Sequence, residues 1–303
     1  MMKKSPRNCI ICGGKGILDI WNGLDVLVCR WCGLAWRSSF NLTMDYYVNL
    51  NFGELDLSEA KASSRIRNSR DRLSLLKRFL PTSNICDVGC GDGSFLVALR
   101  DMGYKHCWGI EPSTFGRDLA FKRQLDVIKG DIFELRKLNT SRKIEAITLF
   151  HVIEHLSDPI EALKILGKTL SHGGILVIET PDLEASIQKV TDHCNPLVCD
   201  EHLFYWSKKS LHAIISRAGF KILLVAHRSF DWKNSSIKCS LARLGLFYST
   251  SRKEVPYSFL SDELGGMKVI RTNFLRKCLR TFLAYFVHIV GRDDYLIVVA
   301  ERL

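Results

Sequence analysis

The sequence lacks an apolar run long enough to cross a bilayer, because a spanning helix needs about 20 apolar residues. The best candidate, Thr281 to Val290, is too short and follows directly on basic residues. The first residues, Met1 to Arg7, lack the apolar core of a signal peptide, so we do not expect a secreted protein. Internal repeats and low-complexity segments are also absent, which excludes a repeat architecture. These absences leave an ordinary globular protein as the expectation.

The charge and the cysteine content indicate partners and a compartment. The chain has 303 residues, enough for one large domain or two smaller ones, and a formal net charge of +11. This charge fits an anionic partner such as a nucleic acid, a nucleotide-linked substrate or an acidic membrane surface. The alternative is a basic protein that has no anionic partner. The 11 cysteines, without a signal peptide, indicate a reducing compartment in which thiols bind metal or pack. We therefore expect a cytoplasmic protein, with attachment to the inner face of the membrane left open.

From residue 84 onward, apolar stretches with the length of strands alternate with longer stretches that have helical periodicity. Strands are predicted at 85–88, 107–110, 126–128, 144–150, 174–180, 221–227 and 294–300, and helices at 94–102, 114–123, 159–170 and 208–218. Asp158 and Pro159 form a good helix start, and Gly219 is a good helix stop. Such alternation predicts an α/β fold with a mostly parallel sheet and helices on both faces.

A glycine-rich turn follows the first of these strands. The stretch from Ile85 to Phe95 reads as a strand ending in an acidic residue, then a turn, then the start of a helix. Glycine brings bare backbone close to a ligand, and the helix behind it aims unpaired N–H groups at that ligand. A nicotinamide fingerprint has its third glycine where this chain has Ser94. The turn instead resembles D-x-G-x-G-x-G, the first motif of class I S-adenosylmethionine (SAM)-dependent methyltransferases, which it matches at all four positions.

This resemblance implies a Rossmann-like sheet of seven strands, mostly parallel with an antiparallel last strand, and a cofactor bound over the carboxyl ends of the strands. Acidic residues recur at those ends, because Glu111 follows the second strand and Asp131 the third. A carboxylate at Glu111 can accept hydrogen bonds from both ribose hydroxyls. The alternative is a nucleotide-binding or flavodoxin-like sheet with incidental acids. The SAM-binding residues that the resemblance implies are Asp87, Gly89, Cys90, Gly91, Gly93, Glu111, Asp131, Ile132, Phe150 and His151.

The fourth strand ends in His151-Val152-Ile153-Glu154-His155, which fits the H-x-x-E-H pattern of some zinc peptidases. That interpretation fails because the next helix starts only three residues later, so the two histidines do not share a helix. The stretch instead resembles the Glu-His-Leu/Val-x-Asp-Pro stretch of small-molecule methyltransferases. His155 and His151 are candidate bases, and Glu154 can orient one of them. In some quinone O-methyltransferases the corresponding Glu-His pair holds a divalent metal. The acidic residue that precedes the pair in that pattern is replaced by His151 here. The other alternative is that these residues only shape the pocket.

A second stretch, Asp200 to Ser207, precedes the helix predicted at 208–218. It resembles the His-x-x-x-Phe/Trp-Ser/Thr stretch of methyltransferases from glycan and natural-product clusters. Its aromatic residues are candidates for the wall of an acceptor pocket, and His202 is a further catalytic candidate. The alternative is a packed aromatic connector with a hydrogen-bonded histidine.

Four cysteines near the start of the chain form two C-x-x-C pairs that are sixteen residues apart. They are Cys9, Cys12, Cys29 and Cys32. Four thiolates in this arrangement suit a tetrahedral Zn²⁺ ion, and a hairpin is expected between the pairs, so the sequence predicts a structural zinc ribbon. Disulfides and inert cysteines are the alternatives. The segment Cys32-Gly33-Leu34, with Tyr46-Tyr47 downstream, resembles the N-terminal ribbon of many bacterial methyltransferases; a ribosomal RNA methyltransferase family with a zinc ribbon also exists.

Residues 274–290 read as a helix with an apolar stripe and basic residues at its start. Such a helix fits an anionic membrane surface. Packing on the catalytic domain, or a dimer seam, predicts the same pattern.

The sequence thus predicts a zinc ribbon at 1–40, a helical connector at 41–80 and a class I methyltransferase domain at 81–303 with an insertion at about 230–292. The favoured function is SAM-dependent methyl transfer to a small-molecule acceptor such as a sugar or glycan precursor. An RNA acceptor is the first alternative, because the ribbon and the charge permit it, although the fourth strand lacks the Asn/Asp-Pro-Pro-Tyr motif of amino-group methylation on bases. A non-catalytic cofactor-binding module is the second. The oligomeric state stays open.

Overall fold

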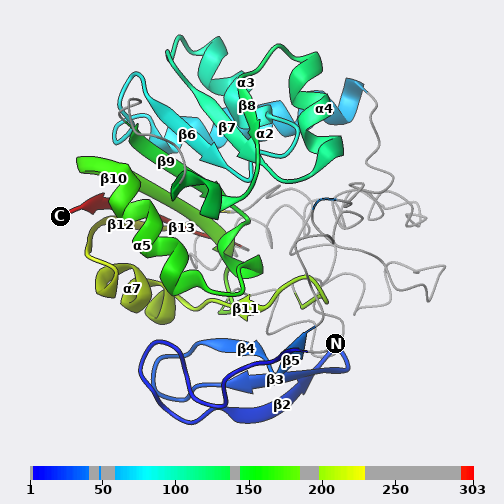
Figure 1. The fold of residues 1–303 in the computed structure, drawn as a ribbon, viewed down its shortest axis with the longest axis vertical. Helices are drawn as coiled ribbons and strands as arrows, with labels where there is room; N and C mark the ends of the chain where they lie inside the picture. Colours follow the sequence, from blue (N-terminus) through cyan, green and yellow to red (C-terminus); the bar gives the residue numbers. More distant parts are fainter. Residues whose placement is uncertain (1–2, 41–47, 49–58, 137–143, 185–197, 229–294) are drawn as a thin grey trace, which may run out of the picture.

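A computed structural model describes residues 3–40, 48, 59–136, 144–184, 198–228 and 295–303 (Figure 1). The helix predicted at 274–290 and the insertion at about 230–292 therefore lie outside the described residues. Among the helices that are described, none has the length and apolarity needed to cross a membrane.

The centre of the molecule is a sheet of seven strands in the order β12-β13-β10-β9-β6-β7-β8. Its strands are β6 (Ile85–Val88), β7 (Trp108–Glu111), β8 (Val127–Lys129), β9 (Ile144–Phe150), β10 (Leu170–Pro181), β12 (Phe220–Arg228) and β13 (Tyr295–Arg302). The last strand, β13, pairs antiparallel with both β10 and β12, while the pairs among β10, β9, β6, β7 and β8 are parallel. The predicted α/β fold with an antiparallel last strand is confirmed.

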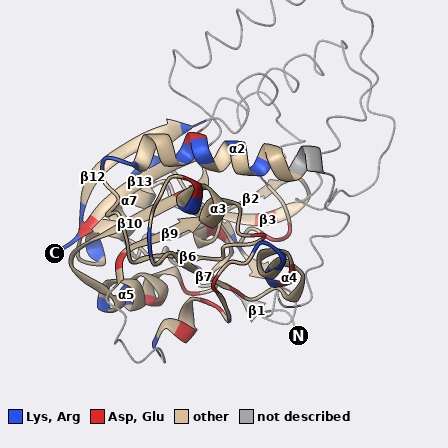
Figure 2. Cartoon of the chain, turned by 90° about the horizontal axis from the view of Figure 1, so that it is seen from above, with Lys and Arg blue, Asp and Glu red and all other residues tan. Residues whose placement is uncertain are grey.

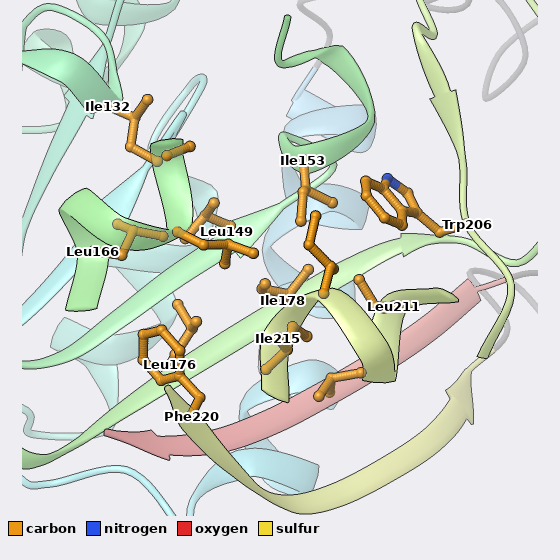
Figure 3. Close-up of a cluster of buried hydrophobic side chains, with 14 of the residues drawn as sticks. Ile132, Leu149, Ile153, Leu166, Leu176, Ile178, Trp206, Leu211, Ile215 and Phe220 are labelled. Carbon is orange, nitrogen blue, oxygen red and sulfur yellow. The ribbon is translucent and has the colours of Figure 1, made fainter. Parts of the chain in front are cut away.

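Alternation along the strands divides the sheet between two layers of helices. Ile85 belongs to the buried cluster under α2 (Glu59–Leu76) and α3 (Ser94–Asp101), whereas the next residue, Cys86, belongs to a second cluster on the other face. Figure 3 shows that second cluster, where α5 (Pro159–Thr169) and α7 (Lys208–Arg217) cover the sheet. A further α-helix in the described part of the chain, α4 (Thr114–Lys122), follows β7.

Helix caps explain why the helices begin where they do. Asp158 accepts a hydrogen bond from the backbone N–H of Glu161 at 2.9 Å, and Pro159 occupies the first turn of α5. Ser207 and Ser210 form a capping box at the start of α7. Both starts agree with the sequence-based predictions.

The cysteine-bearing segment forms a second, smaller sheet in the order β11-β4-β3-β2 (Figure 1). Its first three strands, β2 (Ile17–Trp21), β3 (Leu24–Val28) and β4 (Ala35–Arg37), form the expected hairpin and one further strand. The fourth, β11 (Phe204–Tyr205), comes from the segment between β10 and α7 and pairs antiparallel with β4. Nearby, β1 (Lys3–Lys4) pairs with β5 (Ser39–Phe40). The small sheet is thus completed by a strand that is distant from β4 in the sequence.

Candidate active site

The glycine-rich turn connects β6 to α3 and has the backbone that only glycine adopts without strain. Gly89, Gly91 and Gly93 all have positive φ angles, at 71°, 53° and 74°. A Cβ atom on Gly89 would meet Val152 Cγ2 at 2.6 Å, and one on Gly93 would overlap the Leu125 side chain. A Cβ atom on Gly91 would meet nothing within 4 Å. The turn is therefore packed at both ends and open in its middle.

The Glu111 carboxylate lies beside this open position. Its Oε2 atom accepts a hydrogen bond from the backbone N–H of Gly91 at 2.7 Å, and its Oε1 atom accepts one from Ser113 N–H at 2.9 Å. Asp87, at the end of β6, is 2% exposed and accepts a hydrogen bond from Thr148 Oγ1 at 2.6 Å. Burial raises the pKa of the Asp87 carboxyl to about 7 and also raises the pKa of Glu111. The turn and the first two strand ends therefore form one continuous polar edge.

The other predicted cofactor residues lie near this edge but contribute differently. Asp131, two residues beyond β8, accepts a hydrogen bond from Phe133 N–H at 2.8 Å, at the start of the 3₁₀ turn Ile132–Arg136. The side chains of Ile132 and Cys90 are buried, so only their backbone groups can face a ligand. Phe150, at the end of β9, stacks under the Arg72 guanidinium at 4.1 Å.

Near the end of β10, a buried carboxylate contacts two arginines and a histidine from three other segments. Glu179, which is fully buried, pairs with Arg72 of α2 and with Arg228 of β12, the latter at 3.2 Å. The His151 ring approaches it through Nε2 at 3.2 Å. Burial would raise the pKa of Glu179, but the two arginines hold it well below its usual range. We call Glu179, Arg72, Arg228 and His151 the Glu179 cluster.

A second buried carboxylate, Glu154, lies on the other side of the His151 ring. Its Oε2 atom accepts a hydrogen bond from Thr180 Oγ1 at 3.0 Å, and its Oε1 atom lies 3.4 Å from His151 Nδ1. Burial would raise the pKa of Glu154, but the surrounding histidines, His151 first, bring it to about 2. His151 lies between two carboxylates, which raise its pKa against the opposing effect of burial.

The segment from His151 to His155 is a strand end followed by the single 3₁₀ turn Ile153–His155. His151 has a positive φ of 58°. The two histidines of the motif therefore do not lie on one helix, and the geometry is not that of a zinc peptidase. His155 Nδ1 lies 2.9 Å from the Glu201 carbonyl, and its ring contacts the fully buried His202 ring, with centroids 4.8 Å apart.

The four cysteines predicted to bind zinc are brought together at one end of the small sheet. Their sulfur atoms all lie within 4.8 Å of one another, and both Cys9–Cys32 and Cys12–Cys29 approach to 3.4 Å. Burial would raise the pKa of the Cys29 thiol, but backbone N–H groups of the turn outweigh it and bring the pKa to about 7. This donor set and spacing fit a tetrahedral ion that prefers sulfur.

Comparison with known proteins agrees with this geometry. The profile of a family described as "Methyltransferase domain" matches residues 59–225, more than half of the chain. The chain belongs to this methyltransferase family. The SAM-dependent methyltransferase predicted from the turn at 87–93 is therefore confirmed.

Relatives of this methyltransferase include enzymes that act on transfer RNA. The tRNA U34 carboxymethyltransferase of Campylobacter hominis is 32% identical over 118 residues, which are 36% of this chain and 40% of that protein. The protein of the same name from Campylobacter fetus subsp. fetus is 33% identical over 167 residues, 52% of this chain and 59% of that one. The methyltransferase thus spans about half the length of the curated relatives it matches.

Among solved structures, a complex of the Trm112 methyltransferase activator with a methyltransferase from Haloferax volcanii matches with a TM-score of 0.51 and 17% identity. The match covers 82% of this chain and 97% of that chain. At this identity the likeness shows the fold alone.

Two features of the methyltransferase site were not predicted from the sequence. Glu179 follows the apolar run of β10, two residues before the strand ends, much as Glu111 ends β7, and this pattern was a usable signal. Arg72 lies next to Leu73 on the buried side of α2. A single arginine among apolar residues of a helix is only a weak indication of a buried ion pair.

The aromatic stretch before α7 differs from the expected pocket wall. Phe204, Tyr205 and Trp206 are buried, and the first two form β11 against the small sheet. They therefore form a packed connector, the alternative to an acceptor pocket.

Proposed function

We propose that this methyltransferase transfers the methyl group of SAM to an RNA. The observation that carries the proposal is that the curated relatives matched over its catalytic region are named as tRNA-modifying enzymes. The base position and the transferred group of those relatives are left out of the proposal, because the match covers about half of each protein.

Electrostatics support an acceptor that carries phosphates. The net charge is +11, and α2, whose Arg65 pairs with Asp92 of the glycine-rich turn at 2.7 Å, presents exposed basic residues (Figure 2). On the helix these are Arg67 and Arg70, of which Arg70 pairs with Asp101, and the exposed Lys77 and Arg78 follow directly after it. Because phosphate contacts supply most of the non-specific affinity for nucleic acids, a basic helix beside the cofactor edge helps to hold an RNA there.

The small-molecule acceptor favoured by the sequence has less support. Its expected aromatic wall, at 204–206, is buried in the contact with the small sheet. The membrane contact expected from residues 274–290 lies outside the described residues.

For the cofactor, we propose the polar edge formed by the glycine-rich turn and the strand ends. The residues are the set expected from the sequence, with Glu111 accepting from the ribose hydroxyls and the open face of Gly91 admitting the adenosine. Glu111 accepts a hydrogen bond from Gly91 N–H, so its carboxylate and the open backbone of Gly91 lie side by side. Bound SAM supplies a methyl group on a positively charged sulfur.

The protein's own contribution to methyl transfer is mainly positioning, because an in-line displacement at a sulfonium needs little further help. Of the four catalytic candidates, His151 is held between two buried carboxylates, Glu154 accepts a hydrogen bond from Thr180, and His202 is a buried neighbour of His155. His155 keeps Nε2 as its basic nitrogen when Nδ1–H donates to the Glu201 carbonyl. We therefore propose His155 as the functional histidine of this group.

For the four clustered cysteines, we propose a structural Zn²⁺ site. The small sheet contains few residues for a core of its own, so a bound ion would stabilise it substantially.

Methylation of RNA is tested with SAM labelled in its methyl group. Purified enzyme is incubated with total RNA, with the same RNA digested by nuclease, and with a small-metabolite extract. We expect label in intact RNA with the wild type, and loss of label with Glu111→Ala. Label that appears only in the metabolite extract would overturn the RNA acceptor and restore the small-molecule prediction.

A further inference from the structure

An exposed tryptophan lies in the second of the two C-x-x-C turns, which are residues 9–12 and 29–32. Trp31 is 74% exposed, whereas Trp36 and Trp206 are buried. An indole ring has a large apolar surface, so its exposure leaves that surface available for a ligand. Neither the cofactor edge nor the four thiols that cluster for a metal ion account for this side chain.

The other C-x-x-C turn sets the position of the Trp31 ring. A Cβ atom on Gly14 would lie 2.6 Å from Trp31 Cδ1, so a glycine is needed for the ring to approach the backbone this closely. The same Cβ atom would lie 3.4 Å from the sulfur atoms of Cys12 and Cys29, so the ring lies beside the cysteine cluster. Because the ring is held at one edge and exposed elsewhere, it loses little conformational entropy when a ligand stacks on it.

Helix α7 brings cations to the same two turns (Figure 1). Lys209 Nζ donates to the Trp31 carbonyl at 2.5 Å, and Arg217, at the other end of α7, donates to a backbone carbonyl of the first turn. Lys208 is exposed next to Lys209, and Arg30 is exposed next to Trp31. Residues 3–40 contain six basic and two acidic side chains, and α7 contains three Lys or Arg and no acidic residue. The surroundings of the exposed ring are therefore cationic.

We propose that Trp31, Arg30 and Lys208, which we call the Trp31 surface, bind single-stranded RNA, with the indole ring stacked on an unpaired base. Every base has an aromatic face, and every phosphate attracts cations, so a tryptophan among lysines and arginines matches both parts of a nucleotide. A duplex keeps the faces of its bases inside the stack, so the surface favours unpaired segments. A neutral protein partner would match the ring but not the cations.

This inference rests on the proposed function and deepens it, because it assigns part of the RNA recognition to the small sheet. Hydrogen bonds join that sheet to the end of β9. Arg37 N–H of β4 donates to the Leu203 carbonyl, and Leu203 N–H donates to the Glu154 carbonyl, both at 2.9 Å. An RNA bound at Trp31 is therefore held at a fixed position relative to the strand ends where SAM is proposed to bind.

Binding is measured on the full chain with its cysteines loaded with zinc, by fluorescence anisotropy of a short labelled oligouridine. We expect the wild type to bind, and Trp31→Ala to weaken binding roughly 5- to 150-fold, the usual effect of removing one stacking aromatic residue. Trp31→Phe should restore part of the affinity, because the smaller ring still stacks. Phe121→Ala, at a position of α4 that is 80% exposed, is the matched control and should bind like the wild type.

The cations are tested by the salt dependence of the same binding. Lys208→Ala should lower the slope of log affinity against log salt concentration by about one, because one phosphate contact is lost. Lys122→Ala, at an exposed position of α4, is the control and should leave the slope unchanged. Equal slopes for the wild type and Lys208→Ala would remove Lys208 from the Trp31 surface and contradict its proposed composition.

Zinc content and SAM affinity report whether each variant is folded. Folded Trp31→Ala that binds oligouridine like the wild type overturns the proposal. A wild type that binds SAM but no oligouridine, or binds an RNA duplex as tightly as oligouridine, overturns it even if Trp31→Ala loses its zinc. Trp31-dependent binding to phosphatidylglycerol vesicles, without binding to oligouridine, identifies a membrane contact instead and also overturns it.

The two proposals fail separately. Trp31-dependent binding of oligouridine, together with no methylation of any RNA, overturns the proposed function and leaves the Trp31 surface standing. RNA methylation by an enzyme whose RNA binding is unchanged in folded Trp31→Ala overturns the surface and leaves the proposed function standing.

Discussion

Substituting single glycines of the 87–93 turn separates packing from cofactor binding. Gly93→Ala places a methyl group against Leu125 in a backbone with φ of 74°. A left-handed conformation costs an alanine about 1–2 kcal/mol, and overpacking adds about 1–3 kcal/mol. The free energy of unfolding should therefore fall by about 2–5 kcal/mol.

Gly103→Ala is the control for the conformational cost. Its φ is +84°, and an added Cβ atom would meet nothing within 4 Å. We expect it to lower the free energy of unfolding by only about 1–2 kcal/mol, the backbone cost without the clash. Urea unfolding of both variants and the wild type, followed by circular dichroism, measures the difference. Equal destabilisation by the two substitutions would refute the packing argument.

Gly91→Ala extends the series to the cofactor. Its Cβ atom also has open space, so its stability should match that of Gly103→Ala. The new methyl group, however, points into the space proposed for adenosine, and a clash of about 1–3 kcal/mol corresponds to a loss in SAM affinity of roughly 5- to 150-fold. Calorimetry would contradict the proposed cofactor edge if Gly91→Ala and Gly103→Ala bound SAM equally well.

Three further predictions concern charge and metal. Arg72→Met removes one cation from buried Glu179 and should lower the free energy of unfolding by about 3 kcal/mol, the lower end for a broken buried pair because Arg228 remains. The control is Arg70→Met, which breaks a more exposed pair with Asp101 and should lower it by under about 1 kcal/mol in the same urea assay. Equal losses in the two variants would contradict the buried network. The raised pKa of Asp87, about 7, means that its ionisation in the folded protein costs stability progressively from its unfolded pKa near 3.8 up to about pH 7. Asp87→Asn should therefore gain stability relative to the wild type over that range, by on the order of 4 kcal/mol at most, and a flat difference would show that the carboxyl is not so perturbed. Cys9→Ser should lose the zinc found by metal analysis, whereas Cys107→Ser, outside the cysteine cluster, should keep it; a folded wild type without zinc would exclude the site.

The central sheet could be predicted because its signals are local. Each strand is a short apolar run, and the glycines of the turn at 87–93 mark positions where the backbone has a positive φ. Glu111 was found because it ends a strand next to that turn in a parallel sheet.

The Glu179 cluster could not be predicted in the same way, because it depends on four segments meeting. Arg72 lies 107 residues from Glu179 in the sequence, and Arg228 lies 49 residues from it. The apolar periodicity within one segment does not predict which distant segments it will contact. The two-residue strand β11 is likewise too short to be recognised until its partner β4 is known.

The pairing of β4 with β11 has a consequence for how the nascent polypeptide matures. Arg37 leaves the ribosome long before Phe204, on the order of ten seconds earlier at usual translation speeds. During that interval the outer edge of β4 is unpaired and open to association with other chains. The small sheet, although its first three strands are synthesised before the central sheet, is therefore finished only after β11 has emerged.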